Sequence, residues 1–288
     1  MTLKHGSLFT GVGMIDFGLE MSPEIKTVWQ VEIDPYCKGI LDRRFPGIKK
    51  YGDVKQCKRE ELEHVDILSG GFPCTDISVA GRRKVGDDEW EEGLGIGTRE
   101  DPSSRSGLWY EFHRLITEVK PSWVIVENVA RLCHTEDGST VVSDLAEAGY
   151  AWGATLLATE VLGSPHPRPR VWIVACNDYP LGDGDTGDGV GPLCLPDNQE
   201  RAFAQASENG CYWKRQLGTG TPRPDGNPEQ SESAAYSEGV RRVHDDARWV
   251  DRLRCCGNSV VWVIPACIGA FIVQVERERN SHRDSISV

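Results

Sequence analysis

Short apolar runs alternate with amphipathic segments along the first 175 residues of the chain. The apolar runs are typical of buried strands and occupy residues 3–9, 27–33, 65–68, 123–126 and 171–175. Between them, apolar side chains recur at helical spacing in residues 15–20, 35–44, 108–119 and 141–148. Strands that alternate with helices in this way predict an α/β fold, in which a mostly parallel sheet carries helices on both faces.

Two segments interrupt this alternation. Residues 81–106 are rich in Gly, Asp, Glu and Arg and are too long for an ordinary connection, which predicts a functional loop or disorder. Residues 177–250 are dominated by small and polar residues and predict a small irregular lobe. The apolar residues 260–275 then predict a helix that packs back on the sheet. The expected organisation is therefore a main domain over 1–176, the lobe over 177–250, a helical segment over 251–276 and a polar tail over 277–288.

The net charge and the cysteine spacing argue against some classes of function. A formal net charge of -12 argues against a general basic surface for nucleic acid, so any such surface must be local. The ten cysteines are scattered without zinc-ligand spacing, so we expect buried free thiols and no metal site. No run approaches the ~18 apolar residues of a membrane span, and the N-terminal segment lacks the layout of a signal peptide. We therefore expect a cytoplasmic chain without membrane association.

The first motif with chemical content is Ser7-Leu-Phe-Thr-Gly-Val-Gly13, which follows the first predicted strand. Glycines at this place let the backbone approach a ligand, and Glu32 at the end of the next strand suits a ribose hydroxyl. The third glycine of the dinucleotide fingerprint would fall at position 16, which is Asp16. The pattern therefore favours a nucleoside cofactor and disfavours a dinucleotide.

The second motif, Gly70-Gly-Phe-Pro-Cys74, places a cysteine after the strand predicted at residues 65–68. Open α/β sheets build their sites at the carboxyl ends of parallel strands, where this thiol would lie. A nucleophilic role requires a thiolate, and hence a lowered pKa or a nearby base. By itself the motif is equally consistent with a structural cysteine.

Two further motifs contribute an acid and two arginines. Glu127-Asn-Val follows the predicted strand at residues 123–126, so its carboxyl group should emerge at the same sheet edge as Cys74. A lone glutamate at such a place is also commonly solvated or ion-paired. In Pro165-His-Pro-Arg-Pro-Arg170, an extended proline-stiffened segment puts Arg168 and Arg170 on one side, where they suit carbonyl or phosphate oxygens.

The fifth motif, Gly257-Asn-Ser-Val260, opens the last predicted helix and alone could be a plain helix cap. Together the five motifs resemble, in order and spacing, the cytosine-5 methyltransferase family over nearly the whole chain except residues 177–240. Residues 249–254 resemble the late segment of the phage and prophage members. The resemblance implies a Rossmann-like class I methyltransferase sheet, with residues 177–250 as a target-recognition lobe.

The same resemblance implies S-adenosyl-L-methionine as the cofactor, S-adenosyl-L-homocysteine as its product, and three sets of site residues. The cofactor set is Phe9, Thr10, Gly11, Gly13, Glu32, Ile33, Asp53, Val54, Pro73, Leu108, Asn258 and Ser259. In that set, Glu32 would bind the ribose and Asp53 the adenine. The catalytic set is Cys74 as the nucleophile, Glu127 at N3 and the exocyclic amine of cytosine, and Arg170, with Arg168 beside it, at the base carbonyl. The substrate set is Phe72, Pro73, Ser78, Arg82, Asn128 and His166.

The implied reaction is methyl transfer to carbon 5 of a cytosine flipped out of double-stranded DNA, through a covalent bond between Cys74 and carbon 6. We expect a monomer in the cytoplasm of a bacterial or phage-infected cell, with a cognate restriction endonuclease as a candidate partner. The chain departs from the family at Ser7, usually Asp, and at His166, usually Gln. Two alternatives stay open: a tRNA cytosine-5 methyltransferase, and a homologue that binds DNA and cofactor without turnover.

Overall fold

The computed structural model describes residues 1–73, 108–134, 136–158, 168–177, 251, 255 and 259–286. The strands of this part are β1 (Leu3–Leu8), β2 (Ile25–Val31), β3 (Lys49–Tyr51), β4 (Ile67–Gly70), β5 (Trp123–Val129), β6 (Ala151–Leu157) and β7 (Arg170–Cys176). Its α-helices are α1 (Met14–Leu19), α2 (Pro35–Arg44), α3 (Leu108–Val119), α4 (Glu136–Glu147) and α9 (Val263–Ile286). Short 3-10 helices are η1 (Val54–Gln56), η2 (Arg59–Glu61) and η5 (Ala130–His134).

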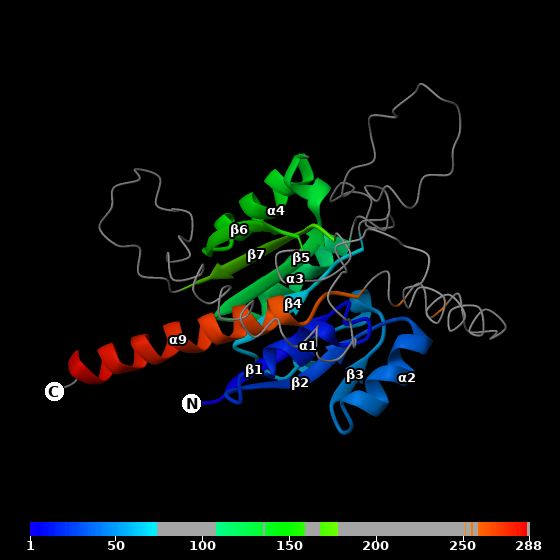
Figure 1. Cartoon of the computed structure of the whole chain (residues 1–288), viewed down its shortest axis with the longest axis horizontal. Helices are drawn as coiled ribbons and strands as arrows, with labels where there is room; N and C mark the ends of the chain where they lie inside the picture. Colours follow the sequence, from blue (N-terminus) through cyan, green and yellow to red (C-terminus); the bar gives the residue numbers. More distant parts are fainter. Residues whose placement is uncertain are drawn as a thin grey trace, which may run out of the picture.

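The strands form one seven-stranded sheet in the order β3-β2-β1-β4-β5-β7-β6 (Figure 1). Neighbouring strands from β3 to β5 are parallel, whereas β7 is antiparallel to both β5 and β6. The predicted mostly parallel α/β sheet is thus confirmed. Because β1, β2, β4 and β5 run in the same direction, the segments that follow them meet at one edge of the sheet.

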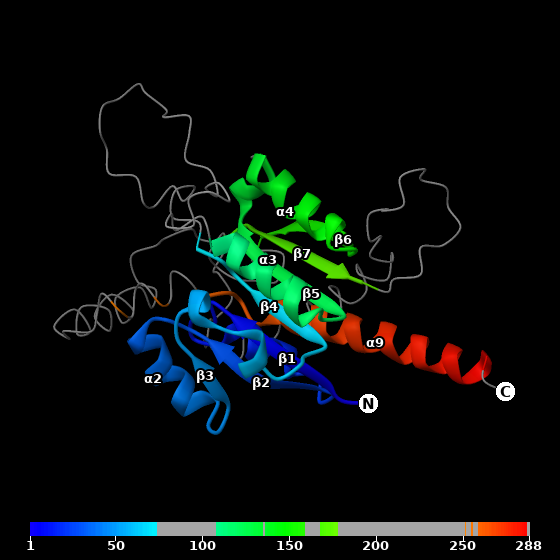
Figure 2. The same cartoon turned by 180° about the vertical axis from the view of Figure 1, so that it is seen from behind.

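Helices cover both faces of the sheet, and each face has its own hydrophobic core. On one face α1 and α9 pack over β1, β5 and β7 (Figure 1). On the other, α3 and α4 pack over the same sheet, and Figure 2 shows α3 lying across it. Five apolar side chains of α3 recur at helical spacing and are buried: Trp109, Phe112, Leu115, Ile116 and Val119. The described part of the chain is therefore a three-layer arrangement of helices, sheet and helices.

Local sequence signals explain where α2 begins. The side chain of Asp34 accepts hydrogen bonds from the backbone N–H groups of Tyr36 and Cys37, and Pro35 occupies the first position of α2. The predicted bounds of α2 and α3 agree with the structure, while those of α1, α4 and most strands differ by a few residues.

The structure also differs from the sequence prediction in three elements. β3 and β6 were not predicted, because β3 has only three residues and β6 is largely half-buried and pairs with β7 alone. Residues 277–288 were expected to form a polar tail, but α9 continues to Ile286. The reason is that polar side chains of α9 still contact the core: the Trp123 indole N–H donates to Glu276 Oε1 at 2.9 Å, and Arg279 Nη2 donates to Cys176 Sγ at 3.0 Å. Across the described segments, no helix combines the length and the apolar character needed to cross a bilayer.

Candidate active site

The segment after β1 makes a sharp turn at the edge of the sheet. Phe9, Gly11 and Gly13 have positive φ angles of 51°, 58° and 77°. At Gly13 a Cβ atom would lie 2.4 Å from the ring of Phe45, so no other residue fits there without a shift. Thr10 fixes the turn by donating its hydroxyl to the carbonyl oxygens of Ser7 and Val31, at 3.2 and 3.1 Å. The result is a rigid glycine turn whose backbone a ligand can approach.

Glu32 follows β2 and is bound to this turn. The N–H of Gly11 donates to Glu32 Oε2 at 2.6 Å, and the N–H of Asp34 donates to Oε1 at 2.8 Å. The residue is 9% exposed, so the carboxylate is nearly buried yet keeps further lone pairs for a ligand hydroxyl. The next residue, Ile33, is 67% exposed and presents an apolar side chain beside it.

The predicted adenine-binding residues follow β3. The N–H of Glu32 donates to the carbonyl oxygen of Tyr51 at 3.2 Å, which joins the ends of β2 and β3. Two residues later Asp53 caps η1 by accepting from the N–H of Lys55 at 3.0 Å. Val54 is buried, and Leu108, the first residue of α3, packs against the same core. Apart from Ser259, which lies shortly before α9, the predicted cofactor residues in the described segments thus lie after neighbouring strands and at the start of α3.

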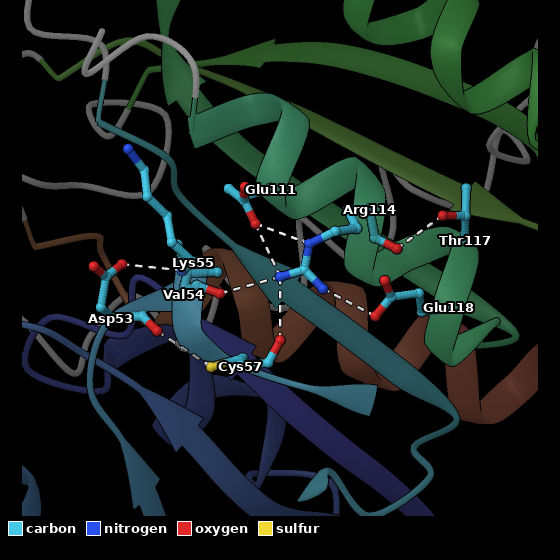
Figure 3. Close-up of polar contacts among 8 residues, drawn as sticks. All are labelled: Asp53, Val54, Lys55, Cys57, Glu111, Arg114, Thr117 and Glu118. Carbon is cyan, nitrogen blue, oxygen red and sulfur yellow. Dashed lines mark hydrogen bonds and ion pairs between the residues drawn. The ribbon is translucent and has the colours of Figure 1, made fainter. Parts of the chain in front are cut away.

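Arg114 of α3 also lies in this region and was not predicted from the sequence. Figure 3 shows its guanidinium group against the turn formed by η1, with Glu111 and Glu118 on either side. The i, i+3 and i, i+4 spacing of these charges is visible in the sequence and predicts ion pairs along the helix. The contact with η1 could not be read from it, because the carbonyl of Val54 is 60 positions away.

A second group of residues surrounds the carboxyl group of Glu127. Arg170, the first residue of β7, pairs with Val129 of β5, so its side chain is diagonal to Glu127 on the same face. Arg170 Nε lies 3.1 Å from Glu127 Oε1. On the other side, a Cβ atom at Gly71 would lie 2.7 Å from Glu127 Oε2. The second glycine of the Gly-Gly-Phe-Pro-Cys motif therefore allows close approach to this acid.

The environment of Glu127 changes its acidity. Burial raises the pKa of the carboxyl group to about 7, although the charges of Arg170 and Arg168 favour the ionised form. A carboxyl group with this pKa is partly protonated at neutral pH. The site therefore holds an acid that can either donate or accept a proton under physiological conditions.

Asn128 fixes the turn that leads towards residue 74. Its Nδ2 donates to the carbonyl oxygen of Phe72 at 3.2 Å, and its Oδ1 accepts from the N–H of Val129 at 2.8 Å. Phe72 is buried with its ring 5.5 Å from that of Trp109, whereas Pro73 is exposed. The end of β4 is thereby attached to β5.

Five predicted site residues lie outside the described residues: Cys74, Ser78, Arg82, His166 and Asn258. Ser259, which follows the last of these, donates its hydroxyl to the carbonyl oxygen of Val260 at 3.4 Å. Residues 249–254, which suggested the phage-type members, are described only at Asp251, so that resemblance stays a prediction. In the described part of the chain, His, Cys, Asp and Glu side chains form no group of three that could hold a metal ion.

Beneath the glycine turn, Ser7 takes part in a buried polar group. Its hydroxyl donates to Asp16 Oδ2 at 3.1 Å, and Gln30 Nε2 donates to Oδ1 of the same carboxyl group at 2.9 Å. Burial raises the pKa of Asp16 to about 6, while the hydrogen bonds from Gln30 and Ser7 oppose this shift. At the position where the family usually has Asp, the serine hydroxyl therefore reaches a carboxyl group supplied from α1.

Comparison with known proteins agrees with this arrangement. The family model described as C-5 cytosine-specific DNA methylase matches residues 3–182. The type II methyltransferase M2.BsuMI of Bacillus subtilis is 33% identical over 180 residues, which cover 60% of this chain and 42% of that protein. The type II methyltransferase M.Bsp6I of Bacillus sp. is 34% identical over 177 residues, which cover 60% of this chain and 51% of that protein. The chain thus spans about half the length of the curated relatives it matches.

Solved structures are similar at the level of the fold. Spodoptera frugiperda DNMT2 matches with a TM-score of 0.50 and 17% identity, over 67% of this chain and 56% of that one. The Dnmt2 methyltransferase of S. pombe matches with a TM-score of 0.51 and 14% identity, over 72% of this chain and 55% of that one. Both likenesses support the Rossmann-like arrangement of the sheet.

Proposed function

The chain belongs to the C-5 cytosine-specific DNA methylase family, and on this premise we propose that it transfers a methyl group from S-adenosylmethionine to carbon 5 of cytosine in DNA. The observation that carries the proposal is the carboxyl group of Glu127, which lies between Gly71 and Arg170 at the edge of the sheet. A flipped base is read through its Watson–Crick edge, and a buried acid beside a guanidinium group suits the N3 and amine of cytosine.

The residues at the ends of β1 and β2 fit the nucleoside part of this cofactor. The positive φ angles of Gly11 and Gly13 leave the backbone open to a ligand, and the fixed carboxylate of Glu32 can accept from ribose hydroxyls. The exposed side chain of Ile33 offers an apolar surface for the adenine ring. When bound, S-adenosylmethionine would supply an electrophilic methyl group, and S-adenosylhomocysteine would be released.

Cytosine must be activated before it can take a methyl group, because its carbon 5 is a poor nucleophile. In the proposed reaction the Cys74 thiolate forms a bond to carbon 6, while Glu127 donates a proton to N3. The pKa of Glu127, raised by burial to about 7, suits this step because the acid can hold a proton at neutral pH. Carbon 5 of this adduct would then take the methyl group. Transfer of the carbon 5 proton to a base, departure of the Cys74 thiolate from carbon 6 and return of the N3 proton to Glu127 restore the ring.

Arg170 has two roles in this proposal. Its Nε is paired with Glu127, which orients the carboxyl group towards the base edge. Its Nη1 donates to the carbonyl oxygen of Pro169 at 2.8 Å. The N–H groups that are left are suited to the carbonyl oxygen of cytosine, because the five N–H groups of arginine lie in one rigid plane. Arg168, whose charge also favours the ionised form of Glu127, would support the same interaction.

The proposal is tested by expressing the wild type, Cys74→Ala and Glu127→Gln in a host without cytosine methylation. Mass spectrometry of nucleosides then measures 5-methylcytosine separately in the DNA and in the tRNA. We expect 5-methylcytosine in DNA for the wild type, none for Cys74→Ala, and a loss of about 100-fold or more for Glu127→Gln, because the proton donor is removed.

Two results would contradict the proposal. Methylation of tRNA without methylation of DNA would support the RNA enzyme, which the sequence leaves open. No methylation of either nucleic acid by a folded wild-type protein would support a homologue that binds without turnover. The relatives bear the names of type II methyltransferases, which favours a role beside a restriction endonuclease in the cytoplasm.

A further inference from the structure

Arg114 links two segments that the proposed function assigns to the adenosine of the cofactor. It lies on α3, whose first residue is Leu108, and its Nη2 donates to the carbonyl oxygens of Val54 and Cys57, both at 3.2 Å (Figure 3). Val54 begins η1, and Asp53 is its cap. One guanidinium group therefore joins the helix that carries Leu108 to the turn that carries Asp53.

Two carboxylates hold this guanidinium group in place. Arg114 Nε donates to Glu111 Oε2 and Nη1 donates to Glu118 Oε2, each at 2.9 Å. Nη2, which also lies 2.9 Å from Glu111 Oε2, donates to the carbonyl oxygens of Val54 in η1 and of Cys57 directly after it (Figure 3). The planar guanidinium group can donate to the two carboxylates and the two carbonyl oxygens at the same time. The single ammonium group of a lysine side chain cannot do this.

The contact continues from Cys57 to Asp53. The Cys57 thiol donates to the carbonyl oxygen of Asp53 at 3.6 Å. Burial raises the pKa of this thiol to about 11, although the charge of Arg114 lowers it, so the thiol stays protonated as a donor at neutral pH. η1 is a single 3-10 turn, and such short turns depend on tertiary contacts for their conformation.

We propose that Arg114 is a positioning residue for the cofactor, which holds the Asp53–Val54 turn in the conformation that receives the adenine. The inference rests on the proposed function, because it requires the adenosine to bind at this edge of the sheet. Arg114 acts through Asp53 and takes no part in the chemistry at cytosine. Its loss should therefore weaken cofactor binding and raise the KM for the cofactor, while kcat at saturating cofactor stays unchanged.

Isothermal titration with S-adenosylhomocysteine tests this on the full chain, using the wild type, Arg114→Ala, Arg114→Lys and the control Arg59→Ala. Arg59 lies on the neighbouring η2 and donates to the carbonyl oxygens of Glu118 and Leu62, outside the Asp53–Cys57 turn. For Arg114→Ala we expect a Kd about tenfold higher, equivalent to about 1.4 kcal/mol. Arg114→Lys should recover only part of the loss, and Arg59→Ala should bind like the wild type.

A double-mutant cycle separates positioning from a general loss of structure. If Arg114 acts through Asp53, adding Arg114→Ala to Asp53→Ala should change the Kd for S-adenosylhomocysteine less than twofold. Adding Arg114→Ala to Glu32→Ala should instead raise this Kd by the full factor of about ten. Equal losses in both backgrounds would overturn the inference. So would an unchanged Kd in Arg114→Ala, whatever its melting temperature. A folded wild type that does not bind S-adenosylhomocysteine would overturn the proposed function together with it.

Discussion

Glu127 is the residue whose surroundings bear most directly on the proposed chemistry. Burial, opposed by Arg170 and Arg168, raises its pKa from 4.5 to about 7. The folded protein therefore holds this proton more tightly than the unfolded chain does. The contribution of the group to stability is complete below about pH 4.5 and is lost as the pH rises through about 7. Near neutral pH the side chain can thus act as an acid without a large free-energy cost.

This environment predicts how the ionisation of Glu127 responds to its neighbours. Replacing Arg170 by Ala removes the adjacent charge that favours the carboxylate. The pKa of Glu127 should therefore rise further, by about one pH unit or more. Infrared difference spectra across a pH titration report the protonated carboxyl band, and the same titration of Glu127→Gln identifies it. A midpoint near 4.5 in the wild type, or a lower midpoint in Arg170→Ala, would rule out this account of the site.

Among the elements, α9 packs on the sheet far along the chain from its strands and is held there by polar as well as apolar contacts. Figure 1 shows α9 lying beside α1 on one face. Glu276 accepts from the indole of Trp123 at 2.9 Å and from Arg279 Nη1 at 2.7 Å. The guanidinium group of Arg279 also lies 5.3 Å from the centroid of the Trp123 ring. Since Trp123 is 0% exposed, its N–H depends on this carboxylate.

We therefore expect Glu276→Ala to lower the free energy of unfolding by about 1–3 kcal/mol, because it leaves a buried indole N–H without its acceptor. The matched control is Glu278→Ala, which removes an exposed carboxylate of the same helix that accepts from Gln274 Nε2 at 3.0 Å. Glu278→Ala should lower the free energy of unfolding by less than about 0.5 kcal/mol. Urea denaturation followed by circular dichroism measures both. Equal effects of the two substitutions would show that Glu276 does not anchor α9.

The elements differ in how well the sequence predicts them, and the reason is the strength of the local signal. α3 has a long amphipathic pattern and α2 has a capping aspartate followed by a proline, so both were predicted with their bounds. β6 carries no such signal, because it pairs with a single strand and its residues are mostly half-buried. The last turns of α9 are polar and stay helical through contacts that span the chain, which no local pattern reveals.

At the scale of the whole molecule, the strand order determines which predicted site residues meet. Glu127 and Arg170 come into contact because β7 lies antiparallel to β5, and Gly71 reaches the same carboxyl group because β4 is parallel to β5. The motifs suggested these residues one by one, and the sheet explains their proximity. The role of Arg114 depends on a contact across the fold between α3 and η1, so no motif indicated it.

The most direct test of the whole account is whether Cys74 forms a covalent bond with carbon 6 of cytosine. The purified chain is incubated with S-adenosylmethionine and genomic DNA in which 5-fluorocytosine replaces part of the cytosine, so no recognition sequence has to be known. Because fluorine cannot leave carbon 5 as a proton does, the adduct should survive denaturation. We predict a DNA-linked peptide that contains Cys74 and is absent for Cys74→Ala. A denaturation-resistant complex that persists in Cys74→Ala, or a linked peptide without residue 74, would contradict the account.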